Sequence, residues 1–129
     1  GRFVLAADTV AAAGRRILGE PPDAAAARAS LAALSGRRHR VTTGVVLLAP
    51  DGRLAERLCE TAVAFARLSG EQIAAYIASG EWQGKAGGYA IQGRGAAFVR
   101  FISGSHSNVV GLPLFETVQL LRGFGWKIP

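Results

Sequence analysis

Residues 39–68 have the sequence HRVTTGVVLLAPDGRLAERLCETAVAFARL. Two β-like runs, 39–50 and 54–68, lie on either side of Asp51 and Gly52. An Asp-Gly pair between runs of this kind is a good hairpin signal, because both residues tolerate the backbone angles of a tight turn. The segment therefore predicts an antiparallel β-hairpin.

One helix is expected before this hairpin and another after it. The alanine-rich run 24–35 follows Asp23, whose side chain can accept a hydrogen bond from the first turn of a helix. Ser69 and Gln72 have the spacing of a capping box, in which each side chain bonds to the backbone of the other residue. The second helix should run to about residue 79.

The remaining segments complete the expected order of elements. FVLAA (3–7) and AAFVRFIS (96–103) have strand patterns, residues 11–23 form a loop or a small hairpin, and residues 104–111 form a polar turn. A last helix is expected at 114–122, directly after a proline. Strand, helix, hairpin, helix, strand and helix together predict an α/β (mixed α+β) fold, with a mixed, twisted sheet and flanking helices.

Length and composition favour one folded domain over residues 1–129. Half of the residues are hydrophobic, which supplies enough apolar material for a core. The chain begins without Met and in the middle of a strand-like run, so we expect it to be shortened at its N-terminus. It has no signal-peptide pattern and no apolar run of membrane-spanning length, which favours a cytoplasmic location and no membrane partner.

Charge and cysteine content narrow the classes of function. The formal net charge of +6 favours anionic partners, but no nucleic-acid-binding motif is present, so no nucleic-acid partner is expected. The single cysteine, Cys59, excludes an internal disulfide and is expected to be a buried, inert thiol. His39 and His106 are isolated, with no second metal ligand at a familiar spacing from either.

Asp8 is the first candidate site residue. It follows the apolar run 3–7, which is typical of a buried strand, and a carboxylate at the end of a strand often lies in a ligand-binding crevice. Such a group can bind a divalent ion or accept a proton from water. The alternative is that Asp8 only caps a turn.

The glycine-rich segment KAGGYAIQGRGAAF (85–98) is the second candidate. Glycines weaken a strand, whereas bare backbone can approach an anion closely. Glu81, Lys85 and Gln92 are the polar side chains that could converge there: lysine suits a phosphate, and glutamine suits the edge of a base or sugar. The alternative is a surface loop with a solvated lysine.

Six motifs occur together in one order: ADTV (7–10), ILGEPPD (17–23), LSGRRHRVTTGV (34–45), ETAVAF (60–65), YIASGEWQGKAGGYAIQG (76–93) and GSHSNVVGLPLFET (104–117). In combination they resemble the Maf-like nucleoside triphosphate pyrophosphatases, a family linked to septum formation. The resemblance covers nearly the whole chain. It implies a mixed α/β fold with a central cleft, similar to the inosine triphosphate pyrophosphatases, and a homodimer is expected at the level of the family.

The resemblance also implies an activity and assigns roles to particular residues. Family members hydrolyse a nucleoside triphosphate to the monophosphate and pyrophosphate with a divalent ion, Mg²⁺ or Mn²⁺. Asp8 matches the proposed proton acceptor and is also the expected metal ligand. Thr9 and Gln92 match positions that set base preference, in the pattern of the branch acting on dTTP and UTP. Lys85 matches a lysine of the cleft, and Glu81 precedes it in the same motif.

Two departures from the family pattern keep a second reading open. The family's N-terminal strand and its phosphate-gripping loop have no counterpart in this sequence, and Glu20 stands where the family usually has a lysine. Both changes weaken the expected grip on a triphosphate. The alternative is therefore an inactive protein of the same descent, which binds nucleotide or a protein partner without turnover.

Overall fold

A computed structural model describes residues 1–129 and has a five-stranded sheet as its centre. The strand order is β2-β1-β3-β4-β5, and every neighbouring pair is antiparallel. The strands are β1 (Val4–Ala13), β2 (Arg16–Leu18), β3 (Arg38–Leu48), β4 (Leu54–Phe65) and β5 (Val99–Ser103). The predicted combination of helices and sheet is confirmed. The sheet is antiparallel rather than the predicted mixed sheet, because no two strands that run in the same direction are neighbours.

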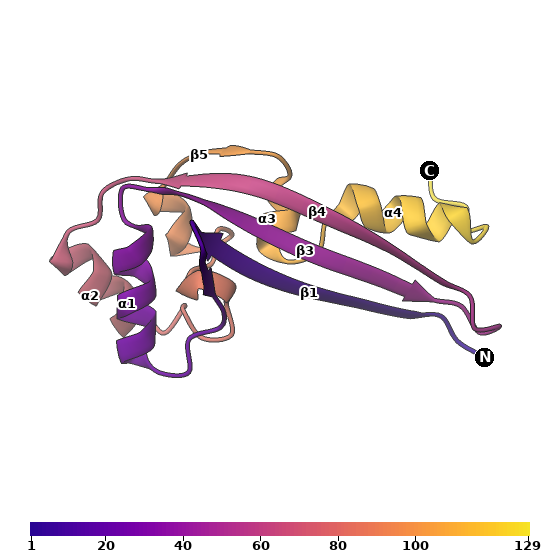
Figure 1. Cartoon of the computed structure of the whole chain (residues 1–129), viewed down its shortest axis with the longest axis horizontal. Helices are drawn as coiled ribbons and strands as arrows, with labels where there is room; N and C mark the ends of the chain where they lie inside the picture. Colours follow the sequence, from indigo (N-terminus) through magenta and orange to yellow (C-terminus); the bar gives the residue numbers. More distant parts are fainter.

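Four α-helices and two 3₁₀ turns accompany these strands, and α3 and α4 follow the last of them. The helices are α1 (Ala24–Leu34), α2 (Gly70–Ala78), α3 (His106–Val110) and α4 (Leu114–Gly123), and the 3₁₀ turns are η1 (Ala86–Gly88) and η2 (Arg94–Phe98). Figure 1 shows α1 and α2 near one end of the long β3–β4 hairpin and α4 beside its other half. No helix is long and apolar enough to cross a membrane.

Local signals in the sequence placed most of these elements correctly. The Asp51–Gly52 turn joins β3 to β4 as predicted. Asp23 accepts a 2.7 Å hydrogen bond from the Ala26 N–H at the start of α1. The capping box of α2 is present: the side chain of Ser69 accepts a hydrogen bond from the backbone N–H of Gln72, and the side chain of Gln72 accepts one from the backbone N–H of Ser69.

Helices cover one face of the sheet and leave the other to solvent. Along β3 the alternate residues His39, Val41, Thr43, Val45 and Leu47 are buried. The three apolar ones, Val41, Val45 and Leu47, divide between two apolar clusters on that face. The larger, of 16 buried residues, joins α1, α2 and the glycine-rich segment to the sheet, and the smaller joins Val45 and Leu47 to Leu120 of α4.

Three further expectations from the sequence are corrected by the structure. The first strand does not end at Asp8 but continues through it to Ala13, and its apolar residues Val4 and Leu5 are exposed rather than buried. The segment 104–111 contains the short helix α3, begun by the Ser105 side chain, instead of being only a polar turn. Cys59 is half-buried rather than fully buried.

The outer edge of β1 is largely unpaired. β3 pairs with β1 from Val4 to Ala12, whereas on the other side β2 pairs only with Ala11 to Ala13. The backbone of residues 4–10 therefore offers unpaired hydrogen-bonding groups along that side. Asp8 lies in the middle of this open edge.

Candidate active site

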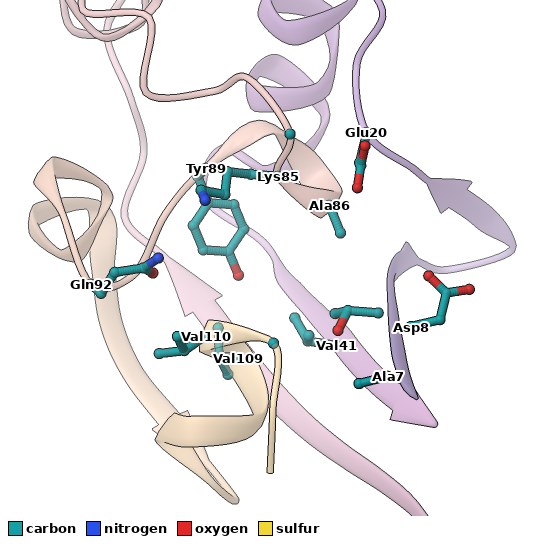
Figure 2. Close-up of a pocket in the computed structure, with 13 residues that line it drawn as sticks. Ala7, Asp8, Glu20, Val41, Lys85, Ala86, Tyr89, Gln92, Val109 and Val110 are labelled. Atoms are coloured by element: carbon teal, nitrogen blue, oxygen red, sulfur yellow. The ribbon is translucent and has the colours of Figure 1, made fainter. Parts of the chain in front are cut away.

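One pocket lies where the open edge of β1 faces the glycine-rich segment and the end of α3 (Figure 2). It brings together four of the five site residues predicted from the sequence, Asp8, Thr9, Lys85 and Gln92. The full lining comprises Ala7, Asp8, Thr9, Glu20, Val41, Gly84, Lys85, Ala86, Tyr89, Gln92, Val109, Val110 and Gly111. Residues far apart in the sequence therefore share one concave site, as expected for a binding pocket.

The first side of the pocket, here called the strand wall, consists of Ala7, Asp8 and Thr9 of β1. Its backbone is held by the β3 ladder, in which Asp8 lies opposite Gly44 and Thr9 opposite Thr43. Successive side chains of a strand point to opposite faces. Asp8 and Thr9 therefore reach the pocket from the two faces of one strand edge, Asp8 exposed and Thr9 half-buried.

The second side, here called the loop wall, consists of Lys85, Ala86, Tyr89 and Gln92. Its path depends on glycine: Gly87 and Gly88 have φ values of +75° and +80°, which other residues rarely adopt. The carbonyl oxygen of Gly87 accepts a 2.6 Å hydrogen bond from the buried Ser30 hydroxyl of α1. The glycine-rich segment is thus a shaped wall fixed to a helix, and not a solvated loop.

Tyr89 anchors the loop wall in the large apolar cluster. Its hydroxyl lies 2.7 Å from His39 Nε2, and its ring packs edge-on against His39 and Phe65. Burial lowers the pKa of His39 from 6.5 to about 4, so this imidazole is neutral near pH 7. Burial also raises the pKa of the Tyr89 hydroxyl, so the pair is an uncharged hydrogen bond.

Glu81 is the predicted site residue that does not line the pocket. Its carboxylate accepts hydrogen bonds from the Tyr76 hydroxyl at 2.8 Å and from the backbone N–H groups of Arg94 and Gly95 at 3.0 and 3.1 Å. Burial acts to raise the pKa of Glu81, but these hydrogen bonds outweigh it and lower the pKa. In this arrangement Glu81 ties α2 to the turn behind the loop wall.

The two carboxylates of the pocket and the part of its lining suited to a base lie on different sides. Figure 2 shows Asp8 and Glu20 on one side, and Gln92 with Val109 and Val110 toward the other. The lining has two carboxylates and one ammonium, Lys85, so its net charge is −1 although that of the chain is +6. A cation in addition to Lys85 would favour the binding of a polyanion here.

The two carboxylates suit a metal ion that is shared with a substrate. No group of three or more His, Cys, Asp or Glu residues could enclose an ion by protein ligands alone. Mg²⁺, however, is usually held by one or two carboxylates together with water and substrate phosphates. Asp8 and Glu20 fit that donor set, and Mn²⁺ accepts the same oxygen ligands.

Sequence reasoning missed several residues that build the pocket. Tyr89, Val109 and Gly111 line it, and Glu20 was recognised only as a departure from a family pattern. Tyr89 lies within the same YAIQG run as Gln92, and this proximity was a usable signal. The segment 109–111 lies within the motif 104–117, but its position at the pocket depends on how α3 packs on β3 and β4.

Comparison with known proteins identifies the group to which the chain belongs. A family model described as "Maf-like protein" matches residues 1–124, and the chain belongs to this family. Similar curated proteins include one from Granulibacter bethesdensis at 65% identity over 97% of this chain, and one from Paramagnetospirillum magneticum at 64% over 98%. Another, from Rhodospirillum rubrum, is 61% identical over 98%.

Each of these three relatives is named a dTTP/UTP pyrophosphatase. The chain spans 59%, 66% and 60% of their respective lengths. Their names therefore describe proteins longer than the segment that aligns with this chain.

Proposed function

We propose that this chain hydrolyses dTTP and UTP to the nucleoside monophosphate and pyrophosphate, with a divalent ion. One observation carries the proposal: Asp8, Lys85 and Gln92, which are distant in sequence, line one pocket together. A carboxylate, an ammonium and an amide are the groups needed to activate water, hold phosphate and contact a base. Membership of the Maf-like family and the names of the similar proteins support the same activity.

Asp8 is the residue to which we assign proton transfer. Its exposed carboxylate on the strand edge can accept a proton from a water molecule as the water oxygen attacks the α-phosphorus. The bond between that phosphorus and its bridging oxygen then breaks, and pyrophosphate leaves with the bonding electrons. The products are the monophosphate, pyrophosphate and the proton transferred to Asp8.

Lys85 and Gln92 bind the two ends of the substrate. Lys85, half-buried in the loop wall, supplies positive charge to phosphate oxygens, where negative charge must be stabilised in the transition state. Gln92 lies near Val109 and Val110, a lining suited to a pyrimidine ring. A metal ion held by Asp8 and Glu20, together with the phosphates, would neutralise charge on the reacting group.

The test is release of pyrophosphate from dTTP, UTP, CTP and 7-methyl-GTP with Mg²⁺ or Mn²⁺. We expect turnover of dTTP and UTP, and a loss of about 10²–10⁴-fold in kcat for Asp8→Asn, the usual range for removing a general base. Asp23→Asn is the matched control, since Asn also caps a helix and Asp23 lies outside the pocket. Equal activity of the Asp8→Asn variant and the wild-type chain would contradict the assigned role.

A second candidate function is nucleotide binding without turnover. Glu20 favours it, because this carboxylate makes the lining net negative and weakens the hold on a triphosphate. Calorimetry with UTP, with and without Mg²⁺, distinguishes the two candidates when combined with the turnover assay. A folded chain that binds UTP but releases no pyrophosphate supports the second candidate, and measurable turnover excludes it.

A further inference from the structure

A buried polar group separates the two apolar clusters and leads to the pocket. Thr43, Thr61 and Asn108 are all 0% exposed. Thr43 lies on β3 between Val41 of the large cluster and Val45 of the small one. Its hydroxyl is 2.8 Å from the hydroxyl of Thr9, the half-buried residue of the strand wall.

The hydrogen bonds of Thr43 allow an arrangement in which the directions of two hydroxyl protons are coupled. Thr43 Oγ1 lies 3.3 Å from the backbone carbonyl oxygen of Asn108, which can only accept. Because a threonine hydroxyl carries one proton, a Thr43 that donates to this carbonyl can only accept from Thr9. In this arrangement Thr9 donates its own proton to Thr43.

Thr9 consequently presents only lone pairs to the pocket. The space next to its hydroxyl is open, because Gly111 has no side chain and a Cβ atom there would lie 3.9 Å from Thr9 Oγ1. A ligand group that meets Thr9 must therefore be a hydrogen-bond donor. Gln92 has no such restriction, because its amide offers both a donor and an acceptor.

Pyrimidine bases differ in what they offer to such an acceptor. Uracil and thymine carry an N3–H between two carbonyl groups, whereas cytosine carries a lone pair at N3. We propose that Thr43 is a positioning residue that holds the Thr9 hydroxyl as an acceptor and thereby favours uracil and thymine nucleotides over cytosine nucleotides. This inference rests on the proposed function, since it concerns the base selected by the same pocket.

Cytosine is disfavoured by the cost of changing this arrangement. With N3 facing Thr9, two lone pairs meet without a proton, unless Thr9 rotates and gives up its bond to Thr43 or the base shifts so that the N4 amino group of cytosine meets Thr9. The site therefore discriminates against cytosine because Thr9 offers no proton to its N3, as well as through its contacts with uracil or thymine. A buried site that leaves a polar group unpaired can reject a competing substrate strongly.

The test compares UTP and CTP in the wild-type chain and in Thr43→Val, Thr43→Ser and Thr61→Val. Valine preserves the shape of Thr43 but removes its hydroxyl, and the Asn108 carbonyl keeps its 3.0 Å hydrogen bond from the Gly111 N–H. We expect the UTP-to-CTP ratio of kcat/KM to fall about ten-fold in Thr43→Val, mainly through KM. Serine should restore the ratio.

Thr61→Val is the matched control. Thr61 is equally buried and bonds to Asn108 Nδ2 at 2.8 Å, but it does not line the pocket. The Thr61→Val variant should be less stable than the wild-type chain, but its UTP-to-CTP ratio of kcat/KM should not change. An unchanged ratio in Thr43→Val, or an equal fall in Thr61→Val, would overturn the inference.

Two further measurements keep the test decisive. If Thr43→Val does not fold, Thr9→Val removes the same acceptor at a half-buried position, and an unchanged ratio there overturns the inference. If the wild-type chain has no turnover, calorimetry with UTP and CTP compares the two affinities directly. Absence of turnover then counts against the proposed activity, whereas equal affinities count against the role of Thr43.

Discussion

The strand wall and the loop wall of the pocket are built by different means. The backbone of Asp8 and Thr9 is placed by the ladder between β1 and β3, and the Asp8 side chain makes no hydrogen bond, whereas the Thr9 hydroxyl is bonded to Thr43. Tyr89 and its neighbours are placed by side-chain hydrogen bonds and by glycines with unusual angles. Reactive groups on the strand wall should therefore tolerate substitution without loss of fold, whereas the loop wall should be sensitive to changes at some distance from the ligand.

The largest expected effect on stability comes from a substitution at Gly95, which lies behind the loop wall. A Cβ atom on Gly95 would lie 2.5 Å from the backbone oxygen of Ala90, which cannot move independently of the turn. We expect Gly95→Ala to lower the free energy of unfolding by roughly 3–4 kcal/mol, as for severe overpacking. Gly70→Ala, where no atom lies within 4 Å, is the control. Equal urea midpoints for the two variants would contradict the comparison.

A smaller effect, on pH dependence, is expected from His39. Its pKa is lowered to about 4 in the folded chain from an ordinary 6.5, so between these values the unfolded chain binds a proton that the folded chain does not. The free energy of unfolding should therefore fall by roughly 3 kcal/mol as the pH drops from 6.5 to 4, and His39 adds no further loss below that.

The substitution His39→Gln isolates this contribution. Glutamine does not titrate and can still bond to the Tyr89 hydroxyl, so the part of the pH dependence between 4 and 6.5 should disappear. His106→Gln, at an exposed position, should retain it. Urea unfolding at several pH values measures the difference, and an unchanged slope in His39→Gln would show that His39 is not its source.

The smallest expected effect on stability is on the strand wall. Asp8→Asn should change the free energy of unfolding by no more than about 0.5 kcal/mol, because the Asp8 side chain is exposed and makes no hydrogen bond within the chain. The same variant is expected to lose activity. A large loss of stability would show that the strand wall depends on its side chains, as the loop wall does.

Much of the fold could be predicted because its signals are local. The Asp51–Gly52 turn, the Asp23 cap and the capping box of α2 each depend on a few neighbouring residues, and all three are confirmed. The course of β1 could not be predicted in the same way. An apolar run predicts burial, but Val4 and Leu5 are exposed, in a part of β1 that pairs only with β3.

The residues of the site also differ in whether they could be predicted from local signals. Asp8, Thr9, Lys85 and Gln92 could be proposed from motifs, and they line one pocket. The function of Glu81 as a hydrogen-bond acceptor for Tyr76 and the turn at residues 94–95 could not, since it depends on tertiary contacts. Thr43 and Asn108 were equally hidden, because their hydrogen bonds join positions 34 and 65 residues apart.

Because Asp8 lies on the open edge of β1, its charge also affects how readily the protein aggregates. Asp8 is the only charged residue between Phe3 and Ala13, a stretch otherwise made of apolar residues and one threonine. A charge on an edge strand opposes the addition of a strand from another molecule. Replacing it with a neutral residue removes this protection, and an Asp8→Asn sample should aggregate more readily in concentrated solution. The carboxylate assigned to proton transfer would thus also keep the strand that carries it soluble.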